Sequence, residues 1–542
     1  MTELLIGGVI MFVVIAAASA GGPRLGVAAP LILVTVGLLA SVVPFVPDVE
    51  IEPEWILEGL LPPLLYSSAV SMPAMNFRRN FGAISGLSVV LVVVTAVVLG
   101  VFFSWAIPGL SLAWGIALGA VISPTDAVAT SIIRRTPVPP RVLAILDGES
   151  LLNDATALVL LRTAVAATAA AFSLGAALGT FARSVVIAVV VGTAVGRLNL
   201  MVRSRVSDAA INTVLSFTVP FLASVPAELL GGSGLVAAVV AGIVTGYRGP
   251  RELSARHRLS DHQVWRTVEV LLEGLIFLTM GLQLSGIMAE VRHEHAGIGA
   301  AMFIAVAALA IGLVIRAGYV SLLLAVLARQ AHRQAALRPH YQRKEKLLAD
   351  KLSSGRTDAL GGRWVSGERR AQRLATRLRR GMSDLDYFMA QPLGVKEGFV
   401  VVWAGMRGAI TVAAVQTLPA DAPSHALLVL VAFAVATLSL LVQGATVGPI
   451  TRVLLADKAA ATEEDERAER AAVLNMLRDV SAATPRREGE QGSDHRMAVL
   501  KAQRAAVLDA RDEGTFDAEV LQNALSNIDA AQIALEMRVK AL

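Results

Sequence analysis

Apolar segments of about 20 residues recur along the first 450 positions of the chain, separated by polar connections. A helix of this length crosses the hydrocarbon core of a bilayer, so each segment is a candidate transmembrane helix. We identify thirteen such spans, at about 4–20, 25–43, 55–74, 83–106, 111–133, 142–170, 174–198, 209–225, 233–247, 266–288, 297–328, 396–418 and 424–450. The pattern predicts an all-α polytopic membrane protein with about 13 transmembrane helices.

The connections between the spans alternate in charge. Lys and Arg in short connections stay on the cytoplasmic side of a membrane. Connections after even-numbered spans are acidic or neutral, apart from Arg292, whereas those after odd-numbered spans are basic. The basic residues are Arg24, Arg78, Arg79, Arg134, Arg135, Arg141, Arg203, Arg205, Arg248, Arg251, Arg256 and Arg258. This alternation predicts a protein of the cell membrane with its N-terminus outside and its C-terminus in the cytoplasm.

Two polar blocks divide the chain into four predicted regions: spans 1 to 11 in 1–328, an insertion in 329–395, spans 12 and 13 in 396–452, and a tail in 453–542. The insertion holds 15 Lys and Arg against 6 Asp and Glu, whereas residues 457–542 hold 12 against 17. Apolar positions at helical spacing predict short cytoplasmic helices in the tail. The two blocks are suited to docking on each other, or the basic block to contacting anionic lipid headgroups.

Composition agrees with a membrane protein. The chain is 55% hydrophobic and 17% charged, with a mean hydropathy of +0.63, whereas soluble domains contain roughly 25% charged residues. The absence of cysteine excludes disulfides and thiolate metal sites. A pI near 9.7 does not indicate a nucleic-acid partner, because the basic residues lie mostly in the connections. The first span ends in "AAASA", similar to a signal-peptidase site, but its "MTE" start lacks Lys and Arg, so we retain it as a span.

Span 5 contains "GAVISPTDAVAT", which puts a proline and a carboxylate at membrane depth. Pro124 has no backbone N–H and disfavours helix in the residue before it, so the span is predicted to break there. Broken helix ends are tolerated in a membrane only beside a cavity or inside protein. Thr125 and Asp126 lie at the break, placed to cap the second half-helix and to offset its positive end. A role for Asp126 as a helix cap alone is the alternative, and it also implies a cavity.

Span 6 begins with "DGESLLNDATALVL". Helical spacing puts Ser150 and Asp154 on one face, and Glu149 and Asn153 on the neighbouring face. Hydroxyl and carboxylate oxygens suit a small, hard monovalent cation and not a soft transition metal. Glu149 can instead be an ordinary acid near a helix N-terminus. Asp154 lies one turn deeper, where an ionisable side chain is costly and therefore a functional candidate.

Span 12 contains "WAGMRGAITVAAVQTL". Gly405 and Gly408 bracket Arg407, which predicts a second locally unwound span. A buried arginine needs an acidic partner, and Glu149 is our candidate. Interrupted spans in the two halves of one membrane protein indicate a transporter site at the midplane, between inverted repeats.

The remaining ionisable residues in or near the membrane are Arg162, Glu273 and Arg316. We predict packing or ion-pair roles for them, because none lies beside a helix-breaking signature. An enzyme is disfavoured, since the spans contain no histidine pair and no nucleophile beside a base, and all eight histidines lie in connections, polar blocks or near span ends.

Four motifs in order, "LPPLLY", "SPTDAVAT", "GESLLNDATALVL" and "WAGMRGAITVAAV", resemble the monovalent cation:proton antiporters, and specifically the sodium/proton exchangers of the electroneutral branch. The resemblance covers all thirteen spans, and the overall organisation is similar to bacterial members with long cytoplasmic tails. It implies inverted repeats with crossed, partly unwound spans 5 and 12. It also implies a homodimer in a lipid bilayer, and no cofactor beyond the transported Na⁺ and H⁺.

The resemblance also implies roles for individual residues. Asp154 is the carboxylate shared by the cation and the proton, with Thr125 and Ser150 as candidate Na⁺ ligands. Asp126 balances the crossing helix ends and is able to bind the cation through water. Asn153 is a further candidate ion-binding residue, and it distinguishes this branch from relatives with two adjacent aspartates.

The resemblance also concerns Glu149, Arg407 and Ser67. Glu149 and Arg407 are implied to form a structural ion pair. Many relatives carry an acidic residue after the "LPP" stretch of span 3, where this chain has Ser67. One carboxylate of the expected ligand set is therefore missing.

A single buried carboxylate in a cavity open to one side at a time predicts exchange by competition. Asp154 cannot hold a cation when protonated, and it needs one when ionised, because an unpaired charge in a low-dielectric site is costly. With Asn153 in place of a second acid, the resemblance implies one-for-one electroneutral exchange. A gated monovalent-cation channel is the alternative from another class, although the repeated filter loops common in channels are absent from the sequence. Within the transporter class, Li⁺ or K⁺ in place of Na⁺ stays open.

Overall fold

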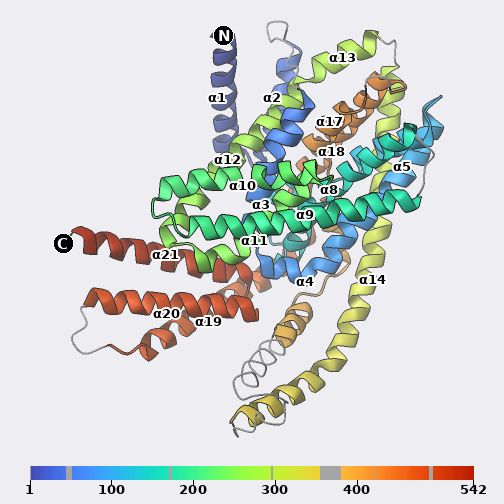
Figure 1. Cartoon of the computed structure of the whole chain (residues 1–542). Coiled ribbons are helices and arrows are strands. Elements are labelled where there is room, and N and C mark those ends of the chain that lie inside the picture. Colours follow the sequence, from blue (N-terminus) through green and yellow to red (C-terminus); the bar gives the residue numbers. More distant parts are fainter. Residues whose placement is uncertain are drawn as a thin grey trace. The chain divides into compact units, whose positions relative to one another are not determined.

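A computed structural model describes residues 2–43, 52–169, 174–293, 297–353, 380–419, 422–486 and 492–541, and over these ranges the secondary structure is helical, with no strand (Figure 1). The all-α prediction is confirmed. Most of the connection after span 2 and residues 354–379 of the basic insertion lie outside the described residues.

The chain divides into two compact units. We name Met1–Val320 with Lys396–Ala456 the membrane unit, and Ser321–Val395 with Asp457–Leu542 the polar unit. In the membrane unit, every predicted span coincides with one helix or with consecutive helical segments. Spans 1 to 7 correspond to α1 (Thr2–Leu25), α2 (Ala29–Ser41), the π-helical η1 (Trp55–Leu60) with α3 (Leu61–Ser71), α4 (Ala74–Ser85) with the π-helical η2 (Gly86–Leu91) and α5 (Val92–Ala106), α6 (Leu112–Ile122) with α7 (Val128–Ile133), α8 (Pro140–Ala169) and α9 (Leu174–Arg203).

Spans 8 to 13 correspond to α10 (Ala209–Leu229), α11 (Gly234–Glu252), α12 (Ala255–Leu282) with α13 (Leu284–His293), α14 (Ile298–Ser353), α16 (Val395–Trp403) with α17 (Ala409–Gln416), and α18 (His425–Leu454), which the short η4 (Ala456–Lys458) follows. Within the described residues, eight helical stretches are long and apolar enough to cross a membrane, and α2 and α6 are shorter apolar helices. The number thirteen stays a prediction.

Helix contacts separate most of the membrane unit into two groups. The α8 group contains α4 to α8 with η2, α17 and α18, and the α12 group contains α1 to α3 and α9 to α12. Small residues allow close packing inside each group. A side chain at Gly119 of α6 would lie 3.1 Å from the Ala96 Cα of α5, and one at Gly192 of α9 would lie 2.9 Å from the Val240 Cβ of α11. Close approach through small residues is the usual way in which membrane helices associate.

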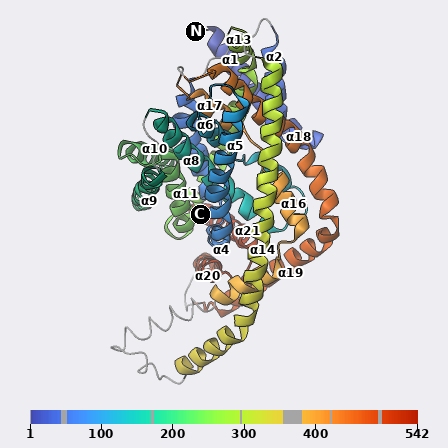
Figure 2. The ribbon, with the colours of Figure 1, turned by 90° about the vertical axis from the view of Figure 1, so that its right-hand side faces the viewer.

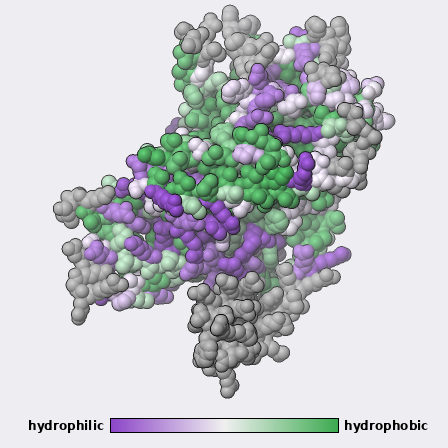
Figure 3. Space-filling model, in the orientation of Figure 1, coloured by the Kyte–Doolittle hydropathy of each residue, from purple (hydrophilic) through white to green (hydrophobic). Residues whose placement is uncertain are grey.

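The α12 group exposes apolar side chains and buries a polar network. Exposed aliphatic residues cover α9 and α10, as Figure 3 shows, and they include Val186, Val190, Ile211, Val214 and Leu222. Such a surface suits contact with lipid. Inside the group, the buried Arg203 donates to Asn212 Oδ1 at 2.8 Å and pairs with Asp261. This network joins the end of α9 to α10 and α12.

The polar unit contains a three-helix bundle made of α19 (Ala459–Ala483), α20 (Gly492–Glu513) and α21 (Ala518–Ala541) (Figure 2). The helices share an apolar core made of Val473, Val507, Leu508, Ala510, Val520, Leu521, Leu525 and Ile528. At the start of α21, the Asp517 backbone N–H donates to Glu469 Oε2 at 2.9 Å. The prediction of a helical tail is confirmed. Residues 380–390 of the insertion are also helical.

Candidate ion-binding site

The break predicted in span 5 is present. Helix α6 ends at Ile122 and α7 begins at Val128, with Pro124 between them. The Asp126 carboxylate accepts a hydrogen bond of 2.9 Å from the Val128 backbone N–H. Asp126, one residue before the N-cap Ala127, therefore satisfies the first backbone N–H of the second half-helix, and its charge lies at the positive end of that helix.

Span 12 is also unwound, between the end of α16 at Trp403 and the start of α17 at Ala409. The two breaks meet, because the Asp126 backbone N–H donates to the Met406 carbonyl at 2.8 Å. The Asp126 side chain packs against Gly408, where an added Cβ would lie 2.7 Å from the Asp126 Cβ and closer still to the carboxylate. The φ of Gly408 is −128°, which any residue adopts. Glycine is therefore needed at 408 for space.

Arg407 lies near the C-terminal ends of α6 and α16, the helices that precede the two breaks. Its Nε donates to the Ile122 carbonyl at 3.1 Å, and its Nη1 donates to the Gly405 carbonyl at 2.6 Å. The Ile122 carbonyl is the C-terminal end of α6, and the Gly405 carbonyl lies two residues beyond the end of α16; helix dipoles leave partial negative charge at these ends. Arg407 thus offsets the negative helix ends, as Asp126 offsets the positive ends.

The predicted ion pair between Glu149 and Arg407 is wrong. Glu149 pairs instead with Arg316 of α14, whose Nη2 lies 2.8 Å from Glu149 Oε2 and whose Nη1 contacts Oε1. Arg316 Nε also donates to the Val401 carbonyl of α16 at 3.0 Å. Glu149 and Arg316 are each only 2% exposed. The prediction of a packing or ion-pair role for Arg316 is confirmed, and the carbonyls at the helix ends explain why Arg407 does not require a carboxylate.

Thr125 and Asn153 connect this ion pair to the break. The Thr125 hydroxyl donates to Glu149 Oε1 at 3.1 Å. The Asn153 amide donates to the Thr125 hydroxyl at 2.8 Å and to the Thr125 carbonyl at 3.1 Å. Asn153 Oδ1 is buried and has no partner within the described ranges. Helix α8 therefore fixes the unwound part of span 5 through side chains that precede Asp154.

A small cavity lies where the breaks meet α8. The volume that the centre of a water molecule can reach in it is about 10 Å³. Its lining residues are Pro124, Thr125, Asp126, Asp154, Gly408, Ile410 and Thr411. A space of this size holds about one water molecule. Asp154 is 5% exposed, and its carboxylate makes no hydrogen bond within the part of the chain that the structure describes. The cavity therefore combines an unsatisfied acid with room for one small occupant.

Three residues differ from the sequence-based site, and the first is Asn153, which lies outside the cavity lining and bonds to Thr125. Ser150 does not line the cavity, and its hydroxyl donates to the Asp147 carbonyl at 3.1 Å. Thr411, which was not among the predicted site residues, does line it and is 1% exposed. Its position three residues after Gly408 puts it on the first turn of α17, a signal that the spacing "GAIT" contains. Ser67 is buried in α3 and does not line the cavity.

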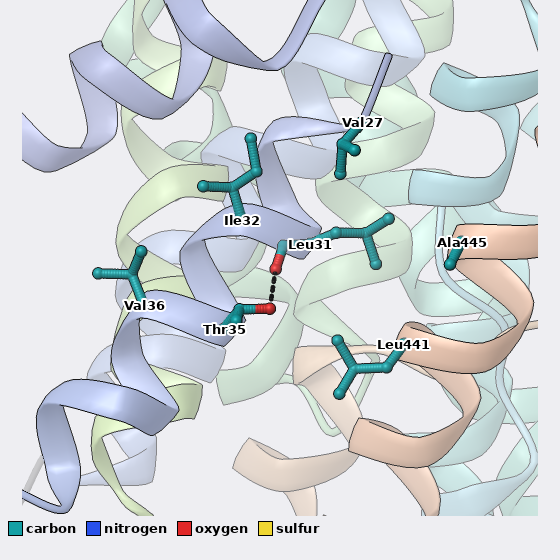
Figure 4. A pocket seen from close by; sticks show the side chains of 7 residues that line it. All are labelled: Val27, Leu31, Ile32, Thr35, Val36, Leu441 and Ala445. Carbon is teal, nitrogen blue, oxygen red and sulfur yellow. Dashed lines mark hydrogen bonds between the residues drawn. The ribbon is translucent and has the colours of Figure 1, made fainter. Parts of the chain in front are cut away.

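A larger groove of about 300 Å³ lies between α2 and α18 (Figure 4). Its lining is Val27, Leu31, Ile32, Thr35, Val36, Leu441 and Ala445. The single hydroxyl in this set, on Thr35, donates to the Leu31 carbonyl at 2.7 Å. No ionisable group lines the groove, so the small cavity is the candidate for binding a cation.

Comparison with known proteins identifies the family. The family model described as "Sodium/hydrogen exchanger, transmembrane" matches residues 9–354. An uncharacterized Na⁺/H⁺ exchanger of Mycobacterium bovis is 30% identical over 465 residues, which cover 83% of this chain and 75% of that protein. This chain belongs to the sodium/hydrogen exchanger family. Members of the family are transporters, so this exchanger is a membrane protein of the cation:proton antiporter class.

A relative from another organism covers less of this exchanger. The sodium, potassium, lithium and rubidium/H⁺ antiporter of Bacillus subtilis is 30% identical over 49% of this chain and 41% of that protein. Among solved structures, the sodium proton antiporter MjNhaP1 from Methanocaldococcus jannaschii matches with a TM-score of 0.55 at 15% identity, over 84% of this chain and 99% of that one. The structural match shows a shared fold.

Proposed function

We propose that this exchanger moves Na⁺ in exchange for H⁺, one for one, with Asp154 as the group that binds either ion. The observation that carries the proposal is the Asp154 carboxylate, which is buried, has no hydrogen-bond partner in the described residues and lines a cavity between two broken helices. Ionisable side chains inside a membrane are retained where they bind or transfer ions. No other carboxylate of α8 lines that cavity.

Competition between the two ions follows from burial. An ionised Asp154 without a cation is an unpaired charge in a low-dielectric site, so it binds either Na⁺ or H⁺. The candidate Na⁺ ligands that line the cavity are Asp154, Thr125, Thr411 and Asp126. Ser150 joins this set only if its hydroxyl turns from the Asp147 carbonyl.

Alternating access is the proposed way of moving the bound ion. The cavity is formed by members of the α8 group, which pack more closely with one another than with the α12 group. We propose that the α8 group moves against the α12 group and exposes Asp154 to one side at a time. Binding sites at the junction of broken helices and inverted repeats operate in this way in secondary transporters.

One-for-one exchange is proposed because Asn153 stands beside Asp154, where a second acid would add another proton-binding group. Na⁺ is the proposed cation on the basis of the family, although the Bacillus subtilis relative is named for K⁺, Li⁺ and Rb⁺ as well. We further propose a homodimer in the cell membrane with the N-terminus outside and the C-terminus in the cytoplasm. On that side, the basic insertion contacts anionic lipid or the acidic tail.

Purified protein in liposomes that contain a pH-sensitive dye tests the proposal. Gradients of Na⁺ or Li⁺ are applied with valinomycin and equal K⁺ on both sides, which holds the membrane potential at zero, and K⁺ gradients are applied without valinomycin. We expect Na⁺-driven H⁺ flux at zero potential in the wild type, and its loss in Asp154→Asn. Asp147→Asn is the matched control, because Asp147 lies on α8 outside the cavity and pairs with Arg134 at 2.8 Å.

Each other outcome changes the conclusion. Flux that requires a membrane potential indicates a channel or an electrogenic exchanger. Flux that survives Asp154→Asn assigns the ion to another carboxylate, with Asp126 the next to test. Flux driven by K⁺ as well as by Na⁺ leaves the proposed antiport mechanism standing and shows that the exchanger is not selective for Na⁺.

A further inference from the structure

The unwound segment of span 12 is held by side chains of α18, a helix that lines no part of the ion cavity. Helices α17 and α18 pack side by side (Figure 1). Ser439 and Gln443 lie one turn apart on α18 and are buried, with exposures of 0% and 3%. Their position on one face directs both side chains at the break between α16 and α17.

Two hydrogen bonds connect this face to the break, and a third joins the two side chains to each other. The Arg407 backbone N–H donates to the Ser439 hydroxyl at 2.9 Å, and that hydroxyl donates to Gln443 Oε1. The Gln443 amide donates to the Trp403 carbonyl at 3.2 Å. An unwound span leaves backbone groups without helical partners, and a buried group left without a partner is costly. Ser439 and Gln443 thus satisfy one backbone group at each end of the unwound segment.

The tethered segment determines the geometry of the ion cavity. Arg407 extends from it to the Ile122 carbonyl at the end of α6. The neighbouring Met406 carbonyl accepts the Asp126 backbone N–H at 2.8 Å, and Gly408 lines the cavity together with Asp154. A shift of the segment therefore moves Asp126 and one wall of the cavity, while Asp154 stays on α8.

We propose that Ser439 and Gln443 are positioning residues that set the affinity of the exchanger for its cation without contacting it. The inference rests on the proposed function, because it concerns the same cavity. It predicts that loss of the tether weakens cation binding more than it slows the maximal rate, since the ligands remain present in a less favourable arrangement.

Measurement of Na⁺-driven H⁺ flux against Na⁺ concentration in liposomes tests this inference. We expect Ser439→Ala to raise the half-saturating Na⁺ concentration about 10-fold, equivalent to about 1.4 kcal/mol, with a much smaller change in maximal rate. Ser439→Thr retains the hydroxyl and is expected to restore most of the affinity. Gln443→Leu is expected to weaken binding in the same direction, and the double variant to be weaker than Ser439→Ala alone, because Gln443 also holds the Trp403 carbonyl.

Thr437→Val is the matched control. Thr437 lies on the same helix, and its buried hydroxyl has no hydrogen-bond partner in the described residues. We expect this variant to keep the wild-type affinity. If Ser439→Ala is not recovered as folded protein, the comparison of Gln443→Leu with Thr437→Val decides the question.

Three results overturn the inference. The first is wild-type Na⁺ affinity in Ser439→Ala or Gln443→Leu, as in Thr437→Val. The others are an equal loss of affinity in Ser439→Thr and Ser439→Ala, or a fall in maximal rate at an unchanged half-saturating Na⁺ concentration. Absence of Na⁺-driven H⁺ flux in the wild type is a different outcome, since it removes the proposed function itself.

Discussion

Substitution of Gly408 by alanine is a direct test of the geometry at the crossing. The new Cβ would lie 2.7 Å from the Asp126 Cβ and closer to its carboxylate, whereas ordinary van der Waals contact begins near 3.4 Å. The Asp126 carboxylate is the nearest group and must therefore move by about 2 Å, a displacement that also disturbs its bond to the Val128 N–H. Backbone strain does not contribute, because the φ of −128° at Gly408 is accessible to alanine.

The expected effect on transport is large and the effect on stability is moderate. A misplacement of about 1 Å in a functional site can lower a rate about 100-fold, so we predict a loss of at least this size in Na⁺-driven H⁺ flux. Overpacking of a buried position costs about 1–3 kcal/mol, which the folded protein tolerates in most cases. The two effects are separable by experiment.

Flux in liposomes and the thermal unfolding midpoint are measured on the same preparations. Gly318→Ala of α14 is the matched control, because an added Cβ at Gly318 meets no atom within 4 Å. Gly318→Ala should retain flux and midpoint, and Gly408→Ala should lose flux while it stays folded. Wild-type flux and half-saturation in Gly408→Ala would refute the reasoning, since Asp126 would then not depend on the space at position 408.

Three further predictions concern other parts of the chain. Glu149→Gln or Arg316→Met alone should destabilise the protein by about 3–5 kcal/mol, and the double variant by clearly less, because a single change leaves one buried charge unpaired; unfolding curves of the three variants check this. Leu521→Ala removes a side chain from the core of the three-helix bundle and should destabilise that bundle by about 2–5 kcal/mol, seen as faster hydrogen exchange in α19 to α21 while exchange in α8 is unchanged. Arg256→Cys adds a thiol to a chain that has no cysteine, and in intact cells it should react with a membrane-impermeant maleimide only after permeabilisation; labelling without permeabilisation contradicts the proposed orientation.

Elements that depend on local sequence could be predicted. Apolar length located the helices, and Pro124 located the break between α6 and α7. The glycines of "WAGMRGAI" located the second break in the same way. Each of these signals determines the conformation of the backbone within a few residues of itself, so the sequence alone is sufficient to predict these helices and breaks.

The partners of buried side chains could not be predicted. Helical spacing showed that Glu149 faces the protein, but it did not show which of two distant arginines lies opposite, and the structure has Arg316 there. Similarly, Ser150 shares a face with Asp154, yet its hydroxyl bonds back to a carbonyl three residues earlier, an option that serine has in any helix. Ser439 and Gln443 gave no signal, because isolated polar residues in an apolar helix do not reveal what they contact.

The placement of charge at the crossing has an electrical consequence. Asp126 and Arg407 are one negative and one positive group on the two unwound segments that the Asp126–Met406 hydrogen bond joins, and Glu149 and Arg316 are another pair of opposite charges. If these couples travel with the cavity, the work that the membrane voltage does on each cancels, whereas a single uncompensated charge would gain or lose about 2.3 kcal/mol per 100 mV. The net charge of these residues then depends on the ion bound to Asp154. With H⁺ or Na⁺ bound, that net charge is zero, so the membrane voltage neither drives nor opposes the movement of the α8 group.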